Sequence, residues 1–132
     1  MIEELSHITF IVKDLERTSK LLTNIFDAKE IYESGEKKYS NSKEKYFLIA
    51  GLWFAIMEGD SLTEKTYNHV ALKISEAEFE KYEERVRSSG VEILEDRNRI
   101  NGEGRSLYFY DYDNHLFELH TGTLDDRLES YK

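Results

Sequence analysis

His7-Ile-Thr-Phe-Ile-Val12 and His69-Val-Ala-Leu-Lys-Ile74 share one pattern, in which a histidine is followed by alternating apolar side chains. Alternation with a period of two predicts a half-buried strand in each segment. Each segment is followed, at the same offset, by an acidic residue, Asp14 or Glu76, and then by apolar residues at helical spacing. The repetition predicts two copies of one structural module.

The remainder of each half continues the same order. The two predicted helices end near residues 27–28 and at Gly90, a residue that favours a helix end. Asp113-Asn114 predicts a tight turn before the last strand. The predicted strands cover residues 7–12, 30–32, 46–50, 52–58, 69–74, 91–94, 106–110 and 116–120.

The order βαβββ therefore occurs twice. The modules span about 1–60 and 66–123, and a hinge near residues 60–65 joins them. A short C-terminal helix is expected over residues 124–131. These elements predict an α+β fold in which residues 1–132 form a single domain.

Composition restricts the protein's location and partners. The chain has no cysteine, which suits a reducing compartment and excludes a Cys-ligated metal site or a thiol nucleophile. The net charge of -9 repels nucleic-acid phosphates and anionic lipid. No apolar run approaches the roughly 20 residues of a membrane span, and the N-terminus lacks a signal-peptide pattern. We therefore expect a cytoplasmic protein that binds neither nucleic acid nor membrane.

A basic cluster stands out in this acidic chain. Arg97, Arg99 and Arg105 lie close together in the sequence, and such a cluster can bind a small anion. It can equally form a solvated loop that balances Glu92, Glu95 and Asp96. Both interpretations fit the residues.

Alternation also predicts which sheet face carries polar groups. The apolar residues of the repeated strands would pack under the helices, and Phe117 and Leu119 would do so in the last strand. The opposite face would then hold His7, Thr9, His69, Ala71, Ser106, Tyr108, Tyr110, Glu118 and His120.

Two histidines and a carboxylate suit a divalent metal with positions left open for substrate. Glu118 and His120 compete for the third ligand because both lie on that face. A single histidine on a strand is more often a hydrogen-bonded structural residue, so a structural role remains an alternative. His115, in the turn, is expected to be structural.

The chain resembles the vicinal oxygen chelate superfamily, and within it the fosfomycin-resistance proteins, closest to the hydrolase branch called FosX. The resemblance covers essentially the whole chain. It is carried by residues 6–9, 67–69, 104–109 and 113–120, which read SHIT, YNH, GRSLYF and DNHLFELH, and by the tail at 121–128.

The resemblance implies paired βαβββ modules, as in the glyoxalase/bleomycin-resistance/dioxygenase fold, that form a metal-binding cup. His7, His69 and Glu118 would bind the metal, usually Mn(II), although other divalent metals fit the same ligands. His120 would then lie beside the ligands. The resemblance also implies a homodimer in which His7 comes from the partner subunit.

The implied substrate is fosfomycin or a related phosphonate, opened at its epoxide by water without an organic cofactor. Glu44 matches the general base, although on its own it is typical of a solvated residue in a charged loop. Arg99 could replace Arg97, whose loop varies in length. The implied phosphonate contacts are Thr9, Tyr67, Arg97, Ser106, Tyr108 and Arg127.

Three other functions fit parts of this pattern. A thiol transferase would open fosfomycin with glutathione or bacillithiol instead of water. Another metalloenzyme of the superfamily, such as an isomerase or dioxygenase, would use the same ligands. A drug-sequestering binder would share the modules, but such binders generally lack the three ligands.

Overall fold

The computed structural model describes residues 1–37, 42–95 and 104–132. It divides into two compact units, residues 1–63 and 64–132, which are described separately below. Their boundary lies within the predicted hinge. That the whole chain forms one domain stays a prediction.

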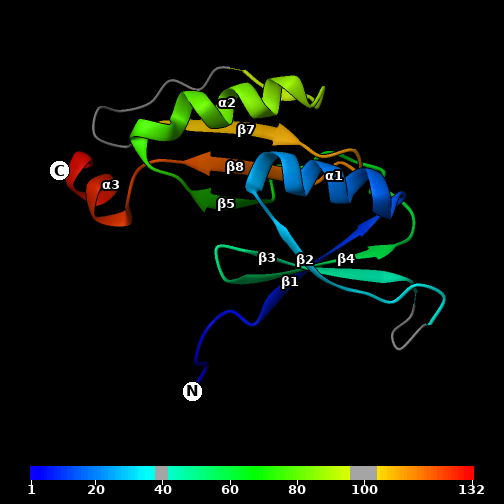
Figure 1. The fold of residues 1–132 in the computed structure, drawn as a ribbon. Coiled ribbons are helices and arrows are strands. Elements are labelled where there is room, and N and C mark those ends of the chain that lie inside the picture. The colour runs from blue at the N-terminus through cyan, green and yellow to red at the C-terminus, as the bar shows by residue number, and fades with distance from the viewer. Residues whose placement is uncertain (38–41, 96–103) are drawn as a thin grey trace. The chain divides into compact units, whose positions relative to one another are not determined.

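The first unit contains one helix and a four-stranded sheet in the order β1-β4-β3-β2. Strand β1 runs parallel to β4, while β3 is antiparallel to both β4 and β2. Its elements, shown in Figure 1, are β1 His7–Val12, α1 Leu15–Phe26, β2 Lys29–Glu33, β3 Glu44–Ile49 and β4 Leu52–Glu58.

The second unit repeats this topology, with the strand order β5-β8-β7-β6 and a parallel β5–β8 pair. A single turn of 3-10 helix, η1, precedes its main helix. The elements are β5 His69–Lys73, η1 Glu76–Glu78, α2 Phe79–Ser88, β6 Ile93–Leu94, β7 Ser106–Tyr110, β8 Leu116–His120 and α3 Leu124–Ser130. The predicted pair of βαβββ modules is confirmed.

Local chemistry explains the helix ends. Asp14 caps α1 by accepting a hydrogen bond from the Arg17 backbone N–H, at 3.0 Å. Asp27 ends the helix in the left-handed conformation, with φ 56°. Gly90 follows the end of α2 with φ 76°, a conformation that suits glycine.

The face of the first sheet that packs against α1 is mainly apolar and also carries the buried side chain of Lys45. Phe47 and Phe54 lie opposite each other on β3 and β4 and are almost fully buried. Lys45 shares their face, and its ammonium lies 2.8 Å from the Glu16 carboxylate of α1 and 3.1 Å from Glu30 of β2. This buried cation therefore ties the helix to the sheet.

Element bounds differ from the prediction mainly at the edges. Strand β6 covers Ile93–Leu94, which pair with Phe109 and Tyr108 of β7, and a hydrogen bond from the Tyr110 N–H to the Glu92 carbonyl adjoins this pairing. Strand β3 begins at Glu44, two residues earlier than predicted. This places Glu44 in the sheet.

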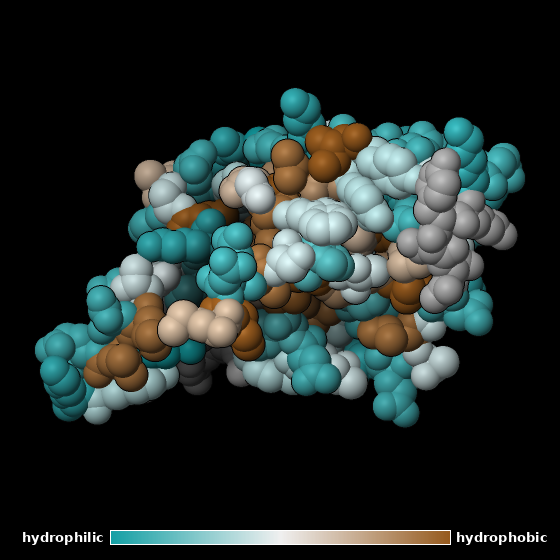
Figure 2. Space-filling view, turned by 90° about the horizontal axis from the view of Figure 1, so that it is seen from below, coloured by the Kyte–Doolittle hydropathy of each residue, from teal (hydrophilic) through white to brown (hydrophobic). Residues whose placement is uncertain are grey.

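Figure 2 shows one face, where apolar groups lie scattered among hydrophilic ones. None of the described helices has the length and apolar character needed to cross a membrane. The cytoplasmic location stays a prediction.

Candidate metal and substrate site

The second unit holds a buried carboxylate, Glu118, in the middle of its sheet. Glu118 pairs with Ala71 on one side and with Tyr108 on the other. Its neighbours Phe117 and Leu119 point the other way and are buried in the core. Glu118 itself is only 4% exposed, so its charge needs polar partners.

Ser106 of the neighbouring strand β7 and His120 of β8 provide two of these partners. The Ser106 hydroxyl donates to Oε2 of Glu118 at 2.5 Å and lies 2.7 Å from Nδ1 of His120. Because a hydroxyl has one proton to donate, His120 must be the donor to Ser106. His120 is therefore held beside the carboxylate through Ser106.

These contacts set the charge of Glu118. Burial favours its neutral form, but hydrogen bonds from Ser106 and Tyr108 and the nearby His120 and His69 outweigh that effect, so the pKa of Glu118 lies below its ordinary value. Glu118 is thus an anion at neutral pH, as a metal ligand must be.

His69 is oriented toward this carboxylate. Its Nδ1 lies 2.7 Å from the Tyr67 backbone carbonyl, an acceptor, which assigns the proton to Nδ1. Nε2, which lies 3.1 Å from Oε1 of Glu118, then keeps its lone pair. A histidine whose other nitrogen is fixed by a carbonyl is the usual arrangement of a metal ligand, so this donor pair fits a divalent cation.

A hollow of about 320 Å³ opens over this pair. Arg127, from α3, lines the hollow together with both proposed ligands. Tyr67 lies two residues before His69 in the sequence. Its hydroxyl donates a hydrogen bond to the Tyr108 hydroxyl, at 2.9 Å. The second unit therefore gathers His69, Glu118, Arg127, Tyr67, Ser106 and Tyr108 in one region.

The first unit holds the remaining described candidates on one sheet face. His7 starts β1, with Nδ1 2.9 Å from the Ser6 hydroxyl and its ring stacked on Trp53 at 4.1 Å. Thr9 is exposed two residues later, on the same face. Sequence reasoning missed Trp53, because its pairing with His7 depends on the parallel β1–β4 register.

Glu44 is only 4% exposed, so the interpretation of it as a solvated loop residue is wrong. It pairs with Met57 and shares its face with Tyr46, which pairs with Ala55 beside Thr9. The hydrogen bond to Glu44 raises the pKa of Tyr46, with burial adding to the effect. Tyr46 thus stays protonated and can donate to the carboxylate.

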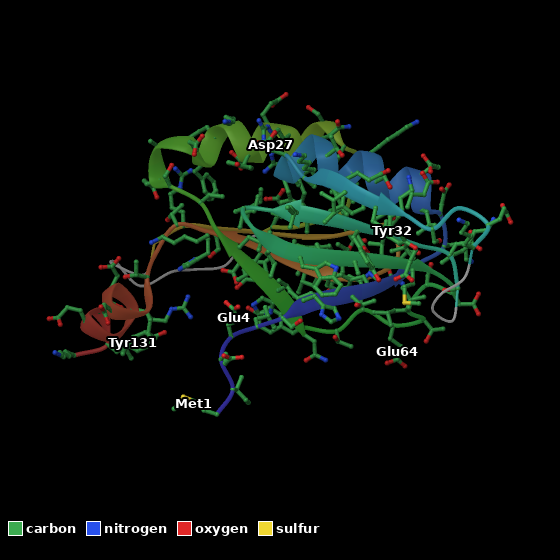
Figure 3. All side chains as sticks on the ribbon, turned by 60° about the horizontal axis from the view of Figure 1, so that its bottom comes forward. Met1, Glu4, Asp27, Tyr32, Glu64 and Tyr131 are labelled. Carbon is green, nitrogen blue, oxygen red and sulfur yellow. The ribbon has the colours of Figure 1, made fainter. Side chains whose placement is uncertain are left out.

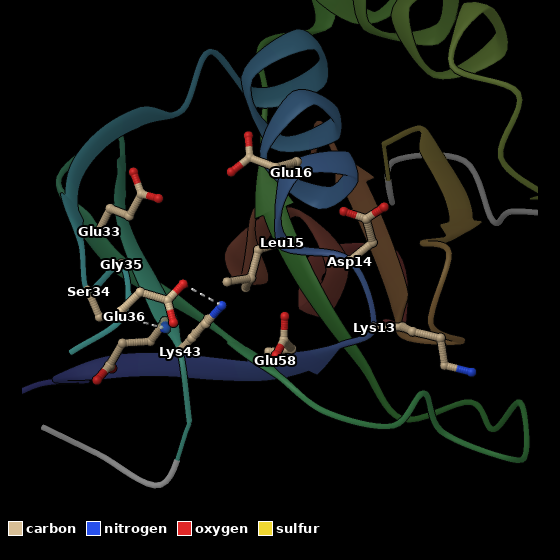
Figure 4. Close-up of a pocket in the computed structure, with 11 residues that line it drawn as sticks. Lys13, Asp14, Leu15, Glu16, Glu33, Ser34, Gly35, Glu36, Lys43 and Glu58 are labelled. Carbon is tan, nitrogen blue, oxygen red and sulfur yellow. Dashed lines mark hydrogen bonds and ion pairs between the residues drawn. The ribbon is translucent and has the colours of Figure 1, made fainter. Parts of the chain in front are cut away.

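A hollow of about 500 Å³ adjoins Glu44 in the first unit. Figure 4 shows acidic side chains around it, with Lys43 bonded to Glu36 at 3.0 Å. The N-terminal end of α1 forms one wall. Sequence alone suggested neither this hollow nor the burial of Glu44, because both depend on where β3 begins.

The predicted basic cluster is only partly described. Arg97 and Arg99 lie outside the described residues. Arg105 pairs with Glu76 and Glu80 at 3.1 and 2.9 Å and stacks on the Phe79 ring, so it serves the packing of η1 and α2 against β7. Of the acidic residues expected to balance the cluster, Glu92 pairs with Lys65 and Glu95 pairs with Arg87, while Asp96 lies outside the described residues.

His115 lies in the β7–β8 turn, where its Nδ1 is 2.8 Å from the Asp111 carboxylate. This contact fits the structural role expected for it. Among residues 1–37, 42–95 and 104–132, no three histidine or acidic side chains form a group able to hold a metal ion.

The chain matches known proteins along nearly its whole length. The family model described as "Glyoxalase/Bleomycin resistance protein/Dioxygenase superfamily" matches residues 4–119. Fosfomycin resistance protein FosX of Listeria monocytogenes serovar 1/2a is 63% identical over 131 residues, which are 99% of this chain and 98% of that protein. The chain belongs to this superfamily and to its FosX family.

Solved structures of FosX share the fold. A mutant FosX from Listeria monocytogenes, complexed with Mn(II) and 1S,2S-dihydroxypropylphosphonic acid, has a TM-score of 0.92 and 61% identity, covering 100% of both chains. Metallothiol transferase FosB of Staphylococcus saprophyticus is more distant, 38% identical over 136 residues, which cover 100% of this chain and 85% of that protein. The predicted fold class and family are confirmed.

Proposed function

We propose that the protein is a Mn(II)-dependent hydrolase that opens the epoxide of fosfomycin with water and inactivates the antibiotic. The observation that carries this proposal is the full-length similarity to FosX, one structure of which holds Mn(II) and a dihydroxypropylphosphonic acid. That compound is the diol formed when water opens an epoxypropylphosphonate. The buried carboxylate and oriented histidines of this chain support the same chemistry.

The proposed metal ligands are His7, His69 and Glu118. In each histidine Nδ1 has a local partner, which leaves Nε2 for the cation. A bound divalent metal would supply Lewis acidity that stabilises the oxygen released as the ring opens. The low pKa of Glu118 keeps this ligand ionised without the metal.

Glu44 is the proposed general base. Its carboxylate takes a proton from water while the water oxygen bonds to an epoxide carbon and the carbon–oxygen bond of the ring breaks. The ring oxygen then takes a proton from solvent, which completes the diol. Burial beside Tyr46 gives Glu44 a fixed position, and such a position is what a base requires.

The phosphonate needs cations and hydroxyl donors around it. Arg127 supplies a cation at the hollow that contains His69 and Glu118, and Tyr67 supplies a half-exposed hydroxyl nearby. Thr9, Tyr108, Ser106 and Arg97 complete the proposed set. Ser106 also supports Glu118 in this structure, so its substitution would affect metal and substrate together.

We also propose a homodimer in which each site takes His7 from one subunit and His69 with Glu118 from the other. Mixing His7→Gln subunits with Glu118→Gln subunits tests this arrangement. A heterodimer would then contain one complete set of ligands, so refolding the mixture should restore part of the activity. Activity that stays at the level of the separate variants would show that each site belongs to one chain.

The reaction itself is tested by incubating the Mn(II)-loaded protein with fosfomycin and no thiol while recording the phosphorus NMR signal. Conversion to the diol, abolished by a chelator, is the expected result. The similarity to FosB makes thiol transfer the second candidate. Conversion only after glutathione or bacillithiol is added would establish that reaction and would overturn the role of Glu44.

A further inference from the structure

Trp53 and His7 form a cross-strand pair at the edge of the first sheet. They are register partners on the parallel strands β4 and β1. Their ring centroids lie 4.1 Å apart and the ring planes differ by only 28°. The contact is therefore a stacked one along the face of the imidazole.

This stack restricts an otherwise exposed side chain. His7 lies at the start of β1 and is largely open to solvent, so without contacts its ring would rotate freely. The Ser6 hydroxyl, 2.9 Å from Nδ1, fixes one edge of the ring, and the indole covers one face. Together they restrict rotation of the ring while engaging Nδ1 and not Nε2.

Trp53 is itself held in place by Tyr46. The Tyr46 ring meets the indole edge-on at 5.2 Å, with the planes at 68°. Tyr32 of β2, labelled in Figure 3, packs against Tyr46 at 4.9 Å. A row of rings therefore runs across the sheet and ends at His7.

The stacking of Trp53 on His7 does not use the indole N–H. Nε1 of Trp53 is buried and has no hydrogen-bond partner among the described residues. Phenylalanine at this position would keep a stacking ring without leaving any described acceptor unpaired. The contribution of the ring can thus be separated from that of the N–H.

We propose that Trp53 is a positioning residue that holds the His7 imidazole ready to bind the divalent metal. This inference rests on the proposed role of His7 as a ligand. Trp53 lowers the entropy that His7 must lose when it coordinates, and it acts on metal affinity before any substrate is bound. Loss of the ring should weaken Mn(II) binding about tenfold, within the range seen when groups that support a metal ligand are removed.

The test is Mn(II) affinity measured by electron paramagnetic resonance, which reports free Mn(II) without any turnover. Trp53→Leu should bind about tenfold more weakly, whereas Trp53→Phe should recover most of the affinity. Tyr32→Leu removes the ring two positions beyond Trp53 in this row and should bind like the wild type. Equal affinity for Trp53→Leu and the wild type, or equal losses in Trp53→Leu and Tyr32→Leu, would overturn the proposal.

His7→Gln separates this inference from the proposed function. If His7→Gln binds Mn(II) as the wild type does, His7 is not a ligand and the proposed ligand set fails. If His7→Gln weakens binding but Trp53→Leu does not, only the positioning role fails. Trp53 is the single tryptophan of the chain, so Mn(II) should also quench the protein's indole fluorescence in the wild type and much less in His7→Gln.

Discussion

The two modules share one backbone plan but place their carboxylates on different strands. In the second module Glu118 lies on β8 between Ala71 and Tyr108. The matching position of the first module, between Thr9 and Tyr46, is Ala55. The first module instead carries Glu44 on β3, where the second carries Ser106. One repeated scaffold thus offers two differently placed carboxylates, for which we propose two different tasks.

The surroundings of the two carboxylates differ as well. Glu118 has hydrogen-bond donors and imidazoles around it, which keep it ionised. Glu44 has Tyr46 as its neighbour on the same strand. A metal ligand needs a permanent charge, whereas a general base needs a fixed position and the ability to accept a proton. The comparison therefore supports the proposal that Glu118 binds the metal and Glu44 transfers the proton.

The largest expected effect comes from removing the charge of the second module. Glu118→Gln should weaken Mn(II) binding roughly 100-fold or more, beyond what is typical for groups that only support a ligand. Isothermal titration calorimetry measures this affinity. Glu129→Gln, an exposed acid on α3, is the matched control and should bind normally. An Mn(II) affinity of Glu118→Gln within a few-fold of the wild type would contradict the proposal that Glu118 is a metal ligand.

The corresponding change in the first module should affect turnover alone. Glu44→Gln should reduce hydration roughly 100-fold, the usual scale for loss of a general base, while Mn(II) affinity stays unchanged. Phosphorus NMR gives the rate and calorimetry the affinity. Glu36→Gln, whose carboxylate in the neighbouring hollow is exposed, serves as the control. A loss of Mn(II) affinity in Glu44→Gln would contradict the division of tasks.

A smaller effect on Mn(II) binding is expected from Ser106, the residue of the second module that matches Glu44. Ser106→Ala removes a hydrogen bond that lowers the pKa of Glu118, so that pKa should rise. Mn(II) affinity at neutral pH should fall about tenfold. Because a higher pKa protonates the ligand sooner as pH falls, binding should also be lost at a higher pH than in the wild type. Ser88→Ala, on the surface of α2, is the control, and identical pH profiles would contradict the supporting role of Ser106.

The smallest expected effects concern the cations that tie each helix to its sheet. Lys45 is buried between Glu16 and Glu30, whereas Arg105 is nearly half exposed beside Glu76 and Glu80. Lys45→Ala loses packing as well as charge, so it should lower the free energy of unfolding by about 2 kcal/mol. Arg105→Ala should cost clearly less, because exposed ion pairs contribute little. Urea denaturation measures both, and the reverse order would show that burial is not the deciding difference.

Much of this arrangement could be predicted from the sequence. The repeated histidine-led strands predicted both modules, and alternation predicted the face that holds His69 and Glu118. Alternation could not choose between Glu118 and His120, since both side chains point the same way. The structure links the two through Ser106, which accepts a hydrogen bond from His120 and donates one to Glu118, and the choice of Glu118 as the ligand stays a prediction.

Other features depend on contacts between distant segments. The stack of Trp53 on His7 requires the parallel β1–β4 register, which local patterns do not determine. The burial of Glu44 requires β3 to begin at that residue, although the preceding residues look like a charged loop. The sequence left open whether Arg105 belongs to an anion site or to a solvated loop, and its pairing with Glu76 and Glu80 depends on the packing of a distant segment.

We propose that Glu44 activates the water molecule that opens the epoxide. The most direct test is to run the reaction in ¹⁸O-labelled water with Mn(II) and no thiol. Mass spectrometry then measures how much ¹⁸O the product contains. The wild type should form a diol with one ¹⁸O atom bound to carbon, and Glu44→Gln should form the same product far more slowly. A product without the label, or equal rates in the two proteins, would contradict the account.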